Sequence, residues 1–239
     1  MSSVLITGAN RGIGLGLVQQ FLNVSSIEHV FATARNVSEA KDLQSISDPK
    51  LHIISLEVTC ENSIKAAVAE VEKIVGDKGL DILINNAGII NRSNFDDKLE
   101  KKTIMQQFEV NSVAPVLIAT AFKDITILRF QNFRELLKKA AKAKGTSQVV
   151  NVSSAAGSLD NAMTIQFTGI SIYSMSKAAL NMMTRKLAQE WKEDNIRVTS
   201  FCPGWVQTEM GGAEAITTVE FSTTSLTYLI LSLSEEHNG

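Results

Sequence analysis

Tyr173 and Lys177 stand four residues apart in the segment ISIYSMSKAALN (170–181), which has the period of a helix. Residues i and i+4 lie on one face of a helix, with Cβ atoms about 5–6 Å apart. A free phenol has a pKa near 10, and a neighbouring ammonium group favours the phenolate. The pair could therefore exchange a proton with a substrate. The same spacing is ordinary on a helix surface, so the surrounding sequence must decide between the two readings.

A glycine-rich stretch near the N-terminus could hold an anion. TGANRGIG (7–14) follows an apolar run and opens a helical period, with glycines at 8, 12 and 14. The N–H groups and the positive dipole end of a helix N-terminus attract a pyrophosphate. Gly12 and Gly14 would remove Cβ atoms where that pyrophosphate approaches the backbone. An ordinary strand-to-helix turn is the alternative, but the position after the first strand favours a nucleotide site.

The second apolar run predicts which nucleotide is bound. A site for NAD has a carboxylate at the end of the second strand, where it accepts a hydrogen bond from the ribose 2′-OH. Here FATARN (31–36) ends in Arg35, and Arg11 lies in the glycine loop. Two guanidinium groups suit a 2′-phosphate because arginine binds phosphate with paired hydrogen bonds. We therefore expect NADP(H) in preference to NAD, the alternative being that Arg35 is a solvated surface residue.

The elements that must position these groups are short apolar runs alternating with helical periods. The runs are VLIT (4–7), VFATA (30–34), LHIISL (51–56), LDILIN (80–85), VVNVS (149–153) and IRVTSF (196–201). Each is apolar or β-branched throughout, as in strands that are covered on both faces. Helical periods follow at 13–22, 63–75 and 225–234. We predict an α/β fold over 1–239, a single-domain Rossmann-type doubly wound parallel sheet with helices on both faces.

Composition excludes several classes of protein. With a formal net charge of −2, the chain has no overall attraction for nucleic acid or anionic lipid. No apolar stretch approaches the roughly 20 residues of a membrane span, and the N-terminus lacks the pattern of a signal peptide. Cys60 and Cys202 have no metal-ligand spacing, and we expect two buried thiols in a reducing compartment. The expected location is the cytoplasm.

Six motifs in order resemble the short-chain dehydrogenase/reductase family, in its Tyr-x-x-x-Lys branch. They are TGANRGIG (7–14), NNAG (85–88), Asn111 in VNSVAP, NVSSAAG (151–157), YSMSK (173–177) and PGWVQT (203–208). The segment CPGWVQTEMGG (202–212) is most similar to the carbonyl-reductase-like subgroup that includes the sniffer and C-factor proteins. The resemblance implies an NADPH-dependent enzyme that reduces an aldehyde, ketone or quinone to the alcohol.

The resemblance also implies a role for each matching position. The catalytic residues would be Asn111, Ser154, Tyr173 and Lys177, with Ser153 as the alternative serine. The residues binding the cofactor would be Gly8, Asn10, Arg11, Gly12, Ile13, Gly14, Arg35, Glu57, Val58, Asn86, Ala87, Gly88, Tyr173, Lys177, Pro203, Gly204, Val206 and Thr208. No metal ion is implied.

These roles divide among proton transfer, hydrogen bonding and cofactor contact. Tyr173 would give its proton to the carbonyl oxygen, Ser154 would donate a hydrogen bond to that oxygen, and Asn111 would hold a water for proton replacement. Lys177 and the positive ring of the oxidised nicotinamide would lower the pKa of Tyr173 by about three, equivalent to about 4 kcal/mol. The glycines would line the pyrophosphate, residues 86–88 the adenosine ribose, and residues 204–208 the carboxamide. Glu57 and Val58 stand where the family usually has Asp-Val beside the adenine.

Three segments depart from the family pattern. Residues 158–171 form a long insert that should loop out beside the substrate site. FKDITILRFQNFRE (122–135) interrupts a helix that commonly contributes to a homodimer interface, leaving Ile125, Ile127, Leu128, Phe130 and Phe133 in need of cover. The family's last strand is missing after HNG, which should expose a sheet edge.

The sequence also bears on assembly, on alternative functions and on the substrate pocket. The resemblance suggests a homodimer through the helix after Asn111 and the helix containing Tyr173. A cofactor-binding sensor without turnover is the alternative function, and a methyltransferase is disfavoured because it leaves Tyr173 and Lys177 unexplained. The substrate pocket would be formed by residues 89–100, 158–171 and 209–222. Candidates for its apolar lining are Phe95, Phe167, Trp205 and Met210.

Overall fold

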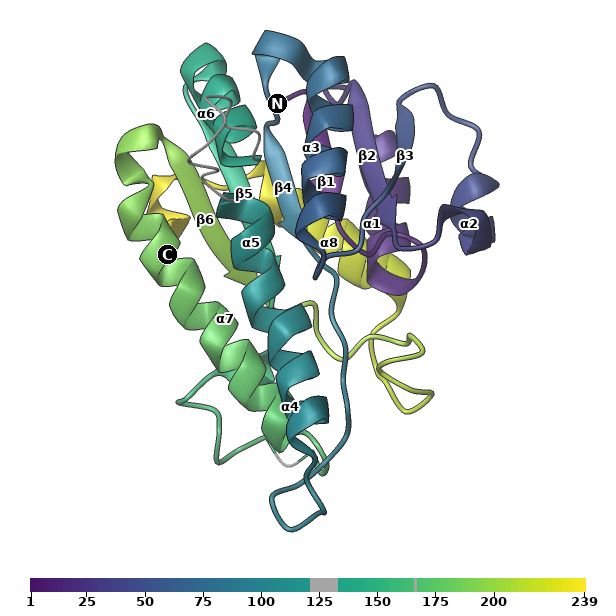
Figure 1. Ribbon diagram of the computed structural model, residues 1–239, viewed down its shortest axis with the longest axis vertical. Helices are drawn as coiled ribbons and strands as arrows, with labels where there is room; N and C mark the ends of the chain where they lie inside the picture. Colours follow the sequence, from purple (N-terminus) through teal and green to yellow (C-terminus); the bar gives the residue numbers. More distant parts are fainter. Residues whose placement is uncertain (121–132, 166) are drawn as a thin grey trace.

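A six-stranded parallel sheet forms the centre of the protein in a computed structural model, which describes residues 1–120, 133–165 and 167–239 (Figure 1). The strand order is β3-β2-β1-β4-β5-β6, and every neighbouring pair is parallel. The strands are β1 (Ser3–Ile6), β2 (His29–Ala34), β3 (Leu51–Ser55), β4 (Ile82–Asn85), β5 (Ser147–Val152) and β6 (Ile196–Phe201). All six predicted strands and the doubly wound order are confirmed, with boundaries displaced by at most two residues.

Helices cover both faces of this sheet. They are α1 (Gly12–Leu22), α2 (Lys41–Gln44), α3 (Glu61–Val75), α4 (Lys101–Phe108), α5 (Ala114–Thr120), α6 (Phe133–Lys144), α7 (Ser171–Glu190) and α8 (Val219–Leu231). Side chains of α3, α5, α6 and α7 share one buried cluster, and those of α1 and α8 share the other. Figure 1 shows the first group in front of the sheet and α1 and α8 behind it. The helix predicted at 225–234 begins six residues earlier and ends at Leu231.

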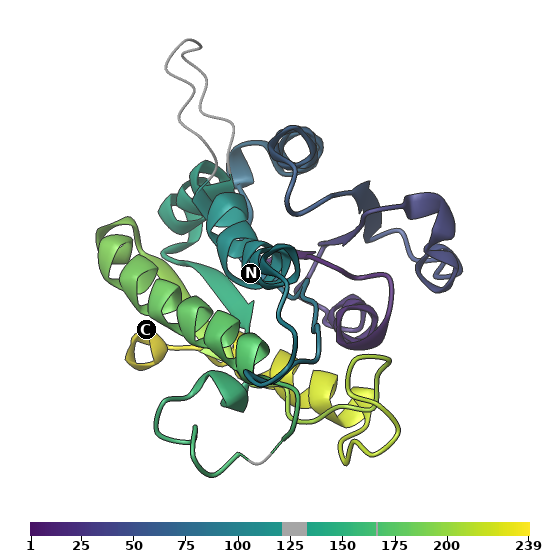
Figure 2. The ribbon, with the colours of Figure 1, turned by 60° about the horizontal axis from the view of Figure 1, so that its bottom comes forward.

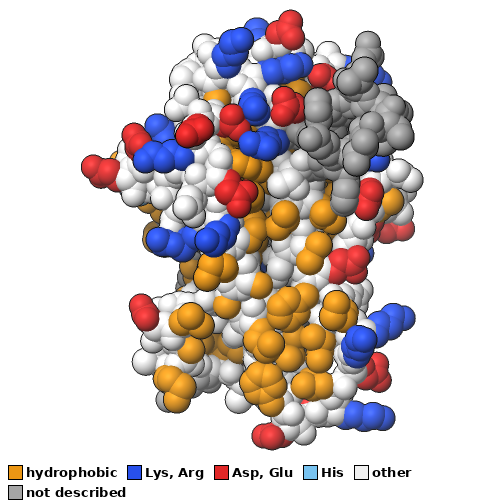
Figure 3. Space-filling model, turned by 60° about the vertical axis from the view of Figure 1, so that its left-hand side comes forward, with side chains coloured by type: hydrophobic (Ala, Val, Ile, Leu, Met, Phe, Trp, Pro, Cys, Tyr) orange, Lys and Arg blue, Asp and Glu red, His pale blue; other side chains and the backbone are white. Residues whose placement is uncertain are grey.

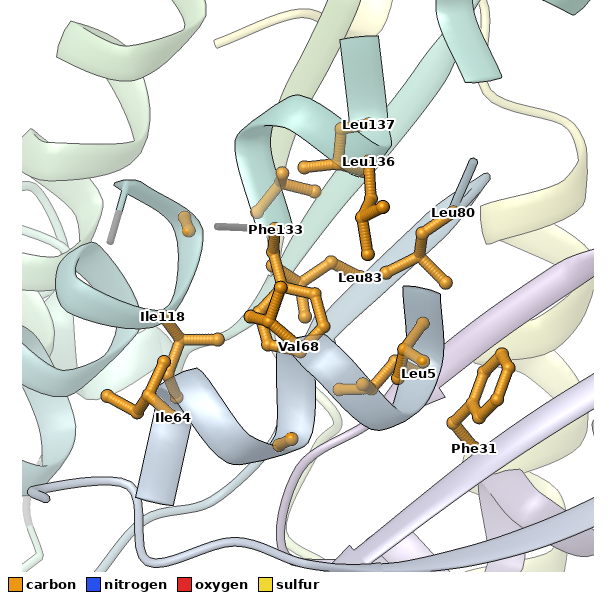
Figure 4. Packing of buried hydrophobic residues seen from close by; sticks show 14 of the residues in the cluster. Leu5, Phe31, Ile64, Val68, Leu80, Leu83, Ile118, Phe133, Leu136 and Leu137 are labelled. Carbon is orange, nitrogen blue, oxygen red and sulfur yellow. The ribbon is translucent and has the colours of Figure 1, made fainter. Parts of the chain in front are cut away.

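Buried apolar side chains hold the front helices to the sheet. Phe133 of α6, Val68 of α3 and Ile118 of α5 are at most 1% exposed and belong to one cluster with Leu83 of β4. Figure 4 shows these side chains directed into the same space. Full burial of such a side chain contributes about 1.5–3 kcal/mol. The packing therefore fixes the sheet on which the functional side chains are carried.

A charged group is buried at the amino end of the sheet. Asp81, which precedes β4, is 0% exposed and accepts hydrogen bonds from the backbone N–H groups of Ser2 and Ser3, both at 2.9 Å. The Lys144 Nζ lies 2.8 Å from Asp81 Oδ2. Burial acts to raise the pKa of the Asp81 carboxyl, but the hydrogen bonds from Lys144, Ser2 and Ser3 together lower it. This end of the sheet holds a fully partnered charge.

The last residues of the chain lie along β6, the edge strand. The Gly239 N–H donates to the Val198 carbonyl at 3.0 Å, and the Val198 N–H donates to the Asn238 Oδ1 at 2.9 Å. The Thr199 hydroxyl donates to the His237 carbonyl at 2.6 Å. The described residues contain no seventh strand, as predicted. The prediction of an exposed edge is wrong at Val198, because Asn238 and Gly239 occupy its backbone N–H and carbonyl groups.

Part of the predicted insert at 122–135 lies outside the described residues, including Ile125, Ile127, Leu128 and Phe130. Phe133 is described, and it is fully buried at the start of α6, so its predicted need for cover is met within the fold. Among the residues that are described, no helix combines the length and apolar character needed to cross a membrane.

Candidate active site

A large cleft lies at the carboxyl ends of the strands, the end of the sheet that Figure 2 turns forward. Its volume is about 1130 Å³, which is enough for a dinucleotide and a small substrate together. Every residue predicted for the site lines this cleft except Asn111. Parallel strands bring their carboxyl ends to one edge, which is why residues far apart in sequence meet there.

The glycine loop leaves the first N–H groups of α1 open to a ligand. Arg11 precedes α1 with extended backbone, and no side chain caps the helix. Asn10, Gly12 and Ile13 line the cleft beside this helix end. Uncapped N–H groups and the helix dipole are the features that bind a pyrophosphate. The loop therefore fits a dinucleotide.

The packing of the loop gives a reason for Gly14 in addition to the predicted one. A Cβ at Gly14 would lie 2.3 Å from the Gly8 carbonyl oxygen and 2.6 Å from the Asn86 Nδ2. Gly14 is thus required by the packing of the loop itself. Gly12 has a φ of 55°, a left-handed conformation in which a side chain is strained. That both glycines also leave room for a pyrophosphate stays a prediction.

Residues 86–88 brace the glycine loop from the neighbouring strand. The Asn86 Nδ2 donates to the Thr7 carbonyl at 2.8 Å and to the Gly8 carbonyl at 3.1 Å. The Thr7 Oγ1 accepts from the N–H groups of Asn86 and Ala87, both at 3.0 Å. Contact between these residues and a cofactor ribose stays a prediction, and their hydrogen bonds hold the shape of the loop.

The two arginines predicted to bind a 2′-phosphate each face a carboxylate. Arg11 forms an ion pair with Glu209, and the side chains of both are mostly exposed. The Arg35 Nε lies 4.0 Å from Glu57 Oε2. Exposed pairs of this kind contribute little to stability, about 0–1 kcal/mol. Both guanidinium groups can therefore exchange these partners for a phosphate at small cost.

Lys177 is buried at the floor of the cleft. Its side chain is on α7, and its Nζ donates to the Val152 carbonyl at 2.8 Å and lies 5.7 Å from the centre of the Tyr173 ring. Lys177 is 5% exposed, and no carboxylate among the described residues pairs with it. Burial lowers the pKa of this amine to about 8.

The pKa of Tyr173 moves in the direction opposite to the prediction. Burial of the phenol raises its pKa to about 12, while a hydrogen bond with the Ser154 side chain acts the other way. Lys177 does not lower it. The expectation that Lys177 makes this phenol acidic is wrong for the protein by itself, because desolvation disfavours the charged form of both groups. The effect of an oxidised nicotinamide ring stays a prediction.

The two candidate serines have different surroundings. Ser153 is 5% exposed, and its hydroxyl donates to the Asn181 Oδ1 at 2.6 Å. The Ser154 Oγ accepts from the Ala156 N–H at 3.1 Å, which leaves its own hydrogen available, and it interacts with Tyr173. Ser154 is thus the serine that can donate to a substrate oxygen.

Asn111 lies behind the cleft in a π-helical turn (Glu109–Val113). Its Nδ2 donates to the Ile89 carbonyl at 2.9 Å and to the Ser176 Oγ at 3.0 Å, and its Oδ1 accepts from the Ile89 N–H at 2.9 Å. The side chain is fully buried. Asn111 thereby ties the loop after β4 to α7, and its predicted contact with a water remains a prediction.

Comparison with known proteins agrees with this arrangement. A family model described as short chain dehydrogenase matches residues 2–217. The chain belongs to the short-chain dehydrogenase family. An uncharacterised oxidoreductase of Schizosaccharomyces pombe is 33% identical over 226 residues, which make up 94% of this chain and 81% of that protein. The protein is accordingly a short-chain dehydrogenase/reductase of the oxidoreductase class, whose fold binds a nicotinamide cofactor.

Two solved structures resemble this dehydrogenase over its full length. The carbonyl reductase Sniffer of D. melanogaster is 34% identical with a TM-score of 0.90, and 100% of this chain and 94% of that chain are covered. An NADPH-bound carbonyl reductase from chicken fatty liver is 38% identical with a TM-score of 0.90 and the same coverage. The enzyme is therefore carbonyl-reductase-like, and the predicted family and subgroup are confirmed.

The part of the cleft that is predicted to hold the substrate has apolar walls. The rings of Phe167 and Trp205 meet edge to face with centroids 5.0 Å apart, and Met210 lines the same space. Phe95 does not line the cleft, contrary to expectation; it is 66% exposed on the loop after β4. The insert at 158–171 does border the cleft, through Ile165, Phe167 and Ile170.

Both cysteines of the dehydrogenase are free and exposed, which contradicts the prediction of buried thiols. Cys60 immediately precedes α3 at the surface, and Cys202 follows β6 and lines the cleft. The prediction rested on the usual burial of free cysteine, but Cys60 stands at the start of α3 and Cys202 directly follows β6, where the chain reaches the surface. Pro203, Gly204, Val206 and Thr208 continue the cleft wall from Cys202.

Sequence reasoning missed several residues of the cleft. Glu209 was absent from the predicted site because its pairing with Arg11 joins residues 198 positions apart. Arg92 was missed because it lies outside the family motifs, although it lines the cleft. The available signal was an arginine just after the NNAG motif, in a segment already predicted to form the pocket.

Proposed function

We propose that the protein is an NADPH-dependent carbonyl reductase that converts an aldehyde, ketone or quinone to the alcohol. The observation that carries this proposal is the meeting of Ser154, Tyr173 and Lys177 at one cleft with an uncapped helix N-terminus beside them. Resemblance to an NADPH-bound carbonyl reductase supports it. When bound, NADPH supplies the hydride.

The chain's own residues would supply the proton and stabilise the developing charge. Tyr173 gives its phenolic proton to the carbonyl oxygen, and Ser154 donates a hydrogen bond to the same oxygen. A phenol with a raised pKa of about 12 stays protonated at neutral pH and is ready to act as the acid. Lys177, whose amine has a pKa near 8, holds positive charge beneath the ring in the neutral range and stabilises the phenolate that remains.

Preference for NADP(H) follows from Arg11 and Arg35. Both guanidinium groups are largely exposed beside the glycine loop, and both can bind a 2′-phosphate once they leave Glu209 and Glu57. We expect Arg35→Ala to weaken NADPH binding about tenfold, since one charge-assisted contact of about 1.4 kcal/mol is lost, and to leave NADH binding nearly unchanged.

The decisive experiment is Tyr173→Phe, which removes only the hydroxyl. Carbonyl reduction should fall about 10²- to 10⁴-fold, the usual contribution of a general acid, while NADPH binding measured by fluorescence persists. Tyr228→Phe is the matched control, because that phenol is 74% exposed on α8 away from the cleft lining. Tight NADPH binding by the unaltered enzyme without turnover of any carbonyl compound would instead identify a cofactor sensor.

A homodimer is part of the proposal, through α7 and the continuous helical segment of α4, the π-helical turn and α5, which extends the predicted surface to residues before Asn111. Exposed apolar side chains gather over the lower half of the side of the molecule in Figure 3. On these helices and the π-helical turn between α4 and α5 they are Met105, Val113, Met175 and Met182, each at least 45% exposed. A second copy would cover this surface. Met182→Glu should convert a dimer to a monomer in light scattering; a monomeric unaltered protein would refute the dimer.

The proposed location is the cytoplasm. Two free, exposed thiols suit a reducing compartment.

A further inference from the structure

Arg92 lines the same cleft as Tyr173 but at its substrate half. The Ser93 N–H donates to the Gly169 carbonyl at 2.9 Å, and Ser93 and Ile170 form a parallel bridge. Ile170 directly precedes α7 and lies three residues before Tyr173. The backbone at Arg92 is therefore fixed close to the start of the helix that carries the proton donor.

The Arg92 side chain points across the cleft. Its Nη2 donates to the Met210 carbonyl at 3.5 Å, which joins the loop after β4 to the loop after β6. Ile90, Ile170 and Phe167 line the cleft around it. A guanidinium group held over apolar walls is a recognition element for an anion attached to an apolar body.

No acid within the described residues neutralises this guanidinium. The acidic residues of the cleft lining are Glu39, Glu57 and Glu209. Glu57 pairs with Arg35 and Glu209 pairs with Arg11, and none of the three forms an ion pair with Arg92. Asp97 and Glu100 border a smaller neighbouring pocket of about 430 Å³ together with Arg92, and neither forms an ion pair with it. Arg92 is thus the available cation for a negatively charged substrate group.

We propose that the enzyme prefers lipophilic carbonyl compounds that carry a carboxylate at a distance from the reacting carbonyl, with Arg92 as the residue that selects them. The inference rests on the proposed carbonyl reduction. In that reaction the carbonyl becomes a CH–OH group, Tyr173 supplies the proton to oxygen, NADPH is oxidised to NADP⁺, and the carboxylate is unchanged. The apolar chain lies against Phe167 and Met210 while the carboxylate accepts hydrogen bonds from the guanidinium.

The test compares 9-oxononanoic acid with its methyl ester, which differ in charge but share the aldehyde and the chain. The unaltered enzyme should favour the acid about tenfold in kcat/KM. In Arg92→Gln, kcat/KM for the acid should fall to the value for the ester, and kcat/KM for the ester should stay unchanged. Arg92→Lys should retain part of the preference. The preference should also fall with added salt, because an exposed charge pair is screened.

Lys98→Gln is the matched control, because Lys98 is an exposed cation of the same loop that does not line the main cleft. It should leave the acid-to-ester ratio unchanged. Equal kcat/KM for acid and ester, or an equal loss for both in Arg92→Gln, would overturn the inference. Reduction of a quinone such as 9,10-phenanthrenequinone with no activity on the acid would also overturn it and leave the proposed function intact. Absence of turnover with every carbonyl compound would overturn both.

Discussion

Ionisable side chains at the two ends of the sheet have opposite surroundings. At the amino end, Asp81 is fully buried, and Lys144, Ser2 and Ser3 supply hydrogen bonds that lower its pKa. At the carboxyl end, Lys177 is buried and Tyr173 is half-buried, and no carboxylate among the described residues pairs with Lys177. Burial shifts the pKa values of both groups toward the neutral forms. The first arrangement contributes to stability, whereas the second provides groups that gain a partner only from ligands.

The difference shows which buried groups of this fold can take part in proton transfer. A buried group with all its hydrogen bonds has one stable protonation state over a wide pH range. A buried group short of partners changes its proton affinity when a ligand brings charge or hydrogen bonds. Perturbed pKa values of the second kind, in a cleft, mark a functional site on physical grounds.

Asp81→Asn tests the contribution of the amino end of the sheet to stability, and we expect it to change the free energy of unfolding more than the other variants do. Breaking this buried ion pair should lower the free energy of unfolding by about 3 kcal/mol, measured by urea denaturation. Because the folded pKa of Asp81 lies below 3.8, its contribution is present above pH 3.8 and is lost as pH falls through the folded value. Glu72→Gln, in the partly exposed pair with Lys139, is the control and should change stability by less than about 1 kcal/mol. A similar loss in both variants would remove the contrast.

Lys177→Met tests the carboxyl end of the sheet and should destabilise the protein much less than Asp81→Asn does. Holding an amine with a pKa near 8 costs the folded protein about 3 kcal/mol at neutral pH. The methionine variant avoids this cost but loses the hydrogen bond from Lys177 to the Val152 carbonyl. Because the two effects oppose each other, the variant should be about as stable as the parent or up to about 2 kcal/mol more stable. The parent should recover stability relative to the variant between pH 8 and 10.5, since its unfolded state binds the additional proton there. Turnover should be largely lost. A loss of 3 kcal/mol or more would place Lys177 with Asp81 as a stabilising charge.

Glu209→Gln has the smallest expected effect and sharpens the comparison within the cleft. Release of Arg11 from its exposed pair should tighten NADPH binding about two- to fivefold, consistent with the small free energy of such pairs. NADH binding, which involves no 2′-phosphate, should stay the same. Glu214→Gln, an exposed acid of the same loop outside the cleft lining, is the control. Weaker NADPH binding would show that Arg11 needs Glu209 for its position.

The sheet, its order and most of the cleft could be predicted from the sequence. Apolar runs such as those at 80–85 and 149–153 predict strands because a parallel sheet buries both of their faces. The motifs at 7–14, 85–88, 151–157 and 203–208 meet because they lie at the ends of these strands, and α7 brings Tyr173 and Lys177 to the same cleft. The pKa of Tyr173 could not be predicted, since it depends on burial that only packing determines. The Arg11–Glu209 pair and the position of Arg92 depend on how loops fold over the cleft, and no periodicity encodes that.

The most direct test of the comparison is an ultraviolet titration of the Tyr173 phenol in a Tyr228→Phe background, in which it is the sole tyrosine. The free protein should show almost no phenolate absorbance at pH 10, where an ordinary phenol is half ionised, because burial raises the pKa to about 12. Saturation with NADP⁺ should bring phenolate absorbance to lower pH, since the positive ring then lies in the cleft. Half ionisation near pH 10 in the free protein, unchanged by NADP⁺, would contradict the account.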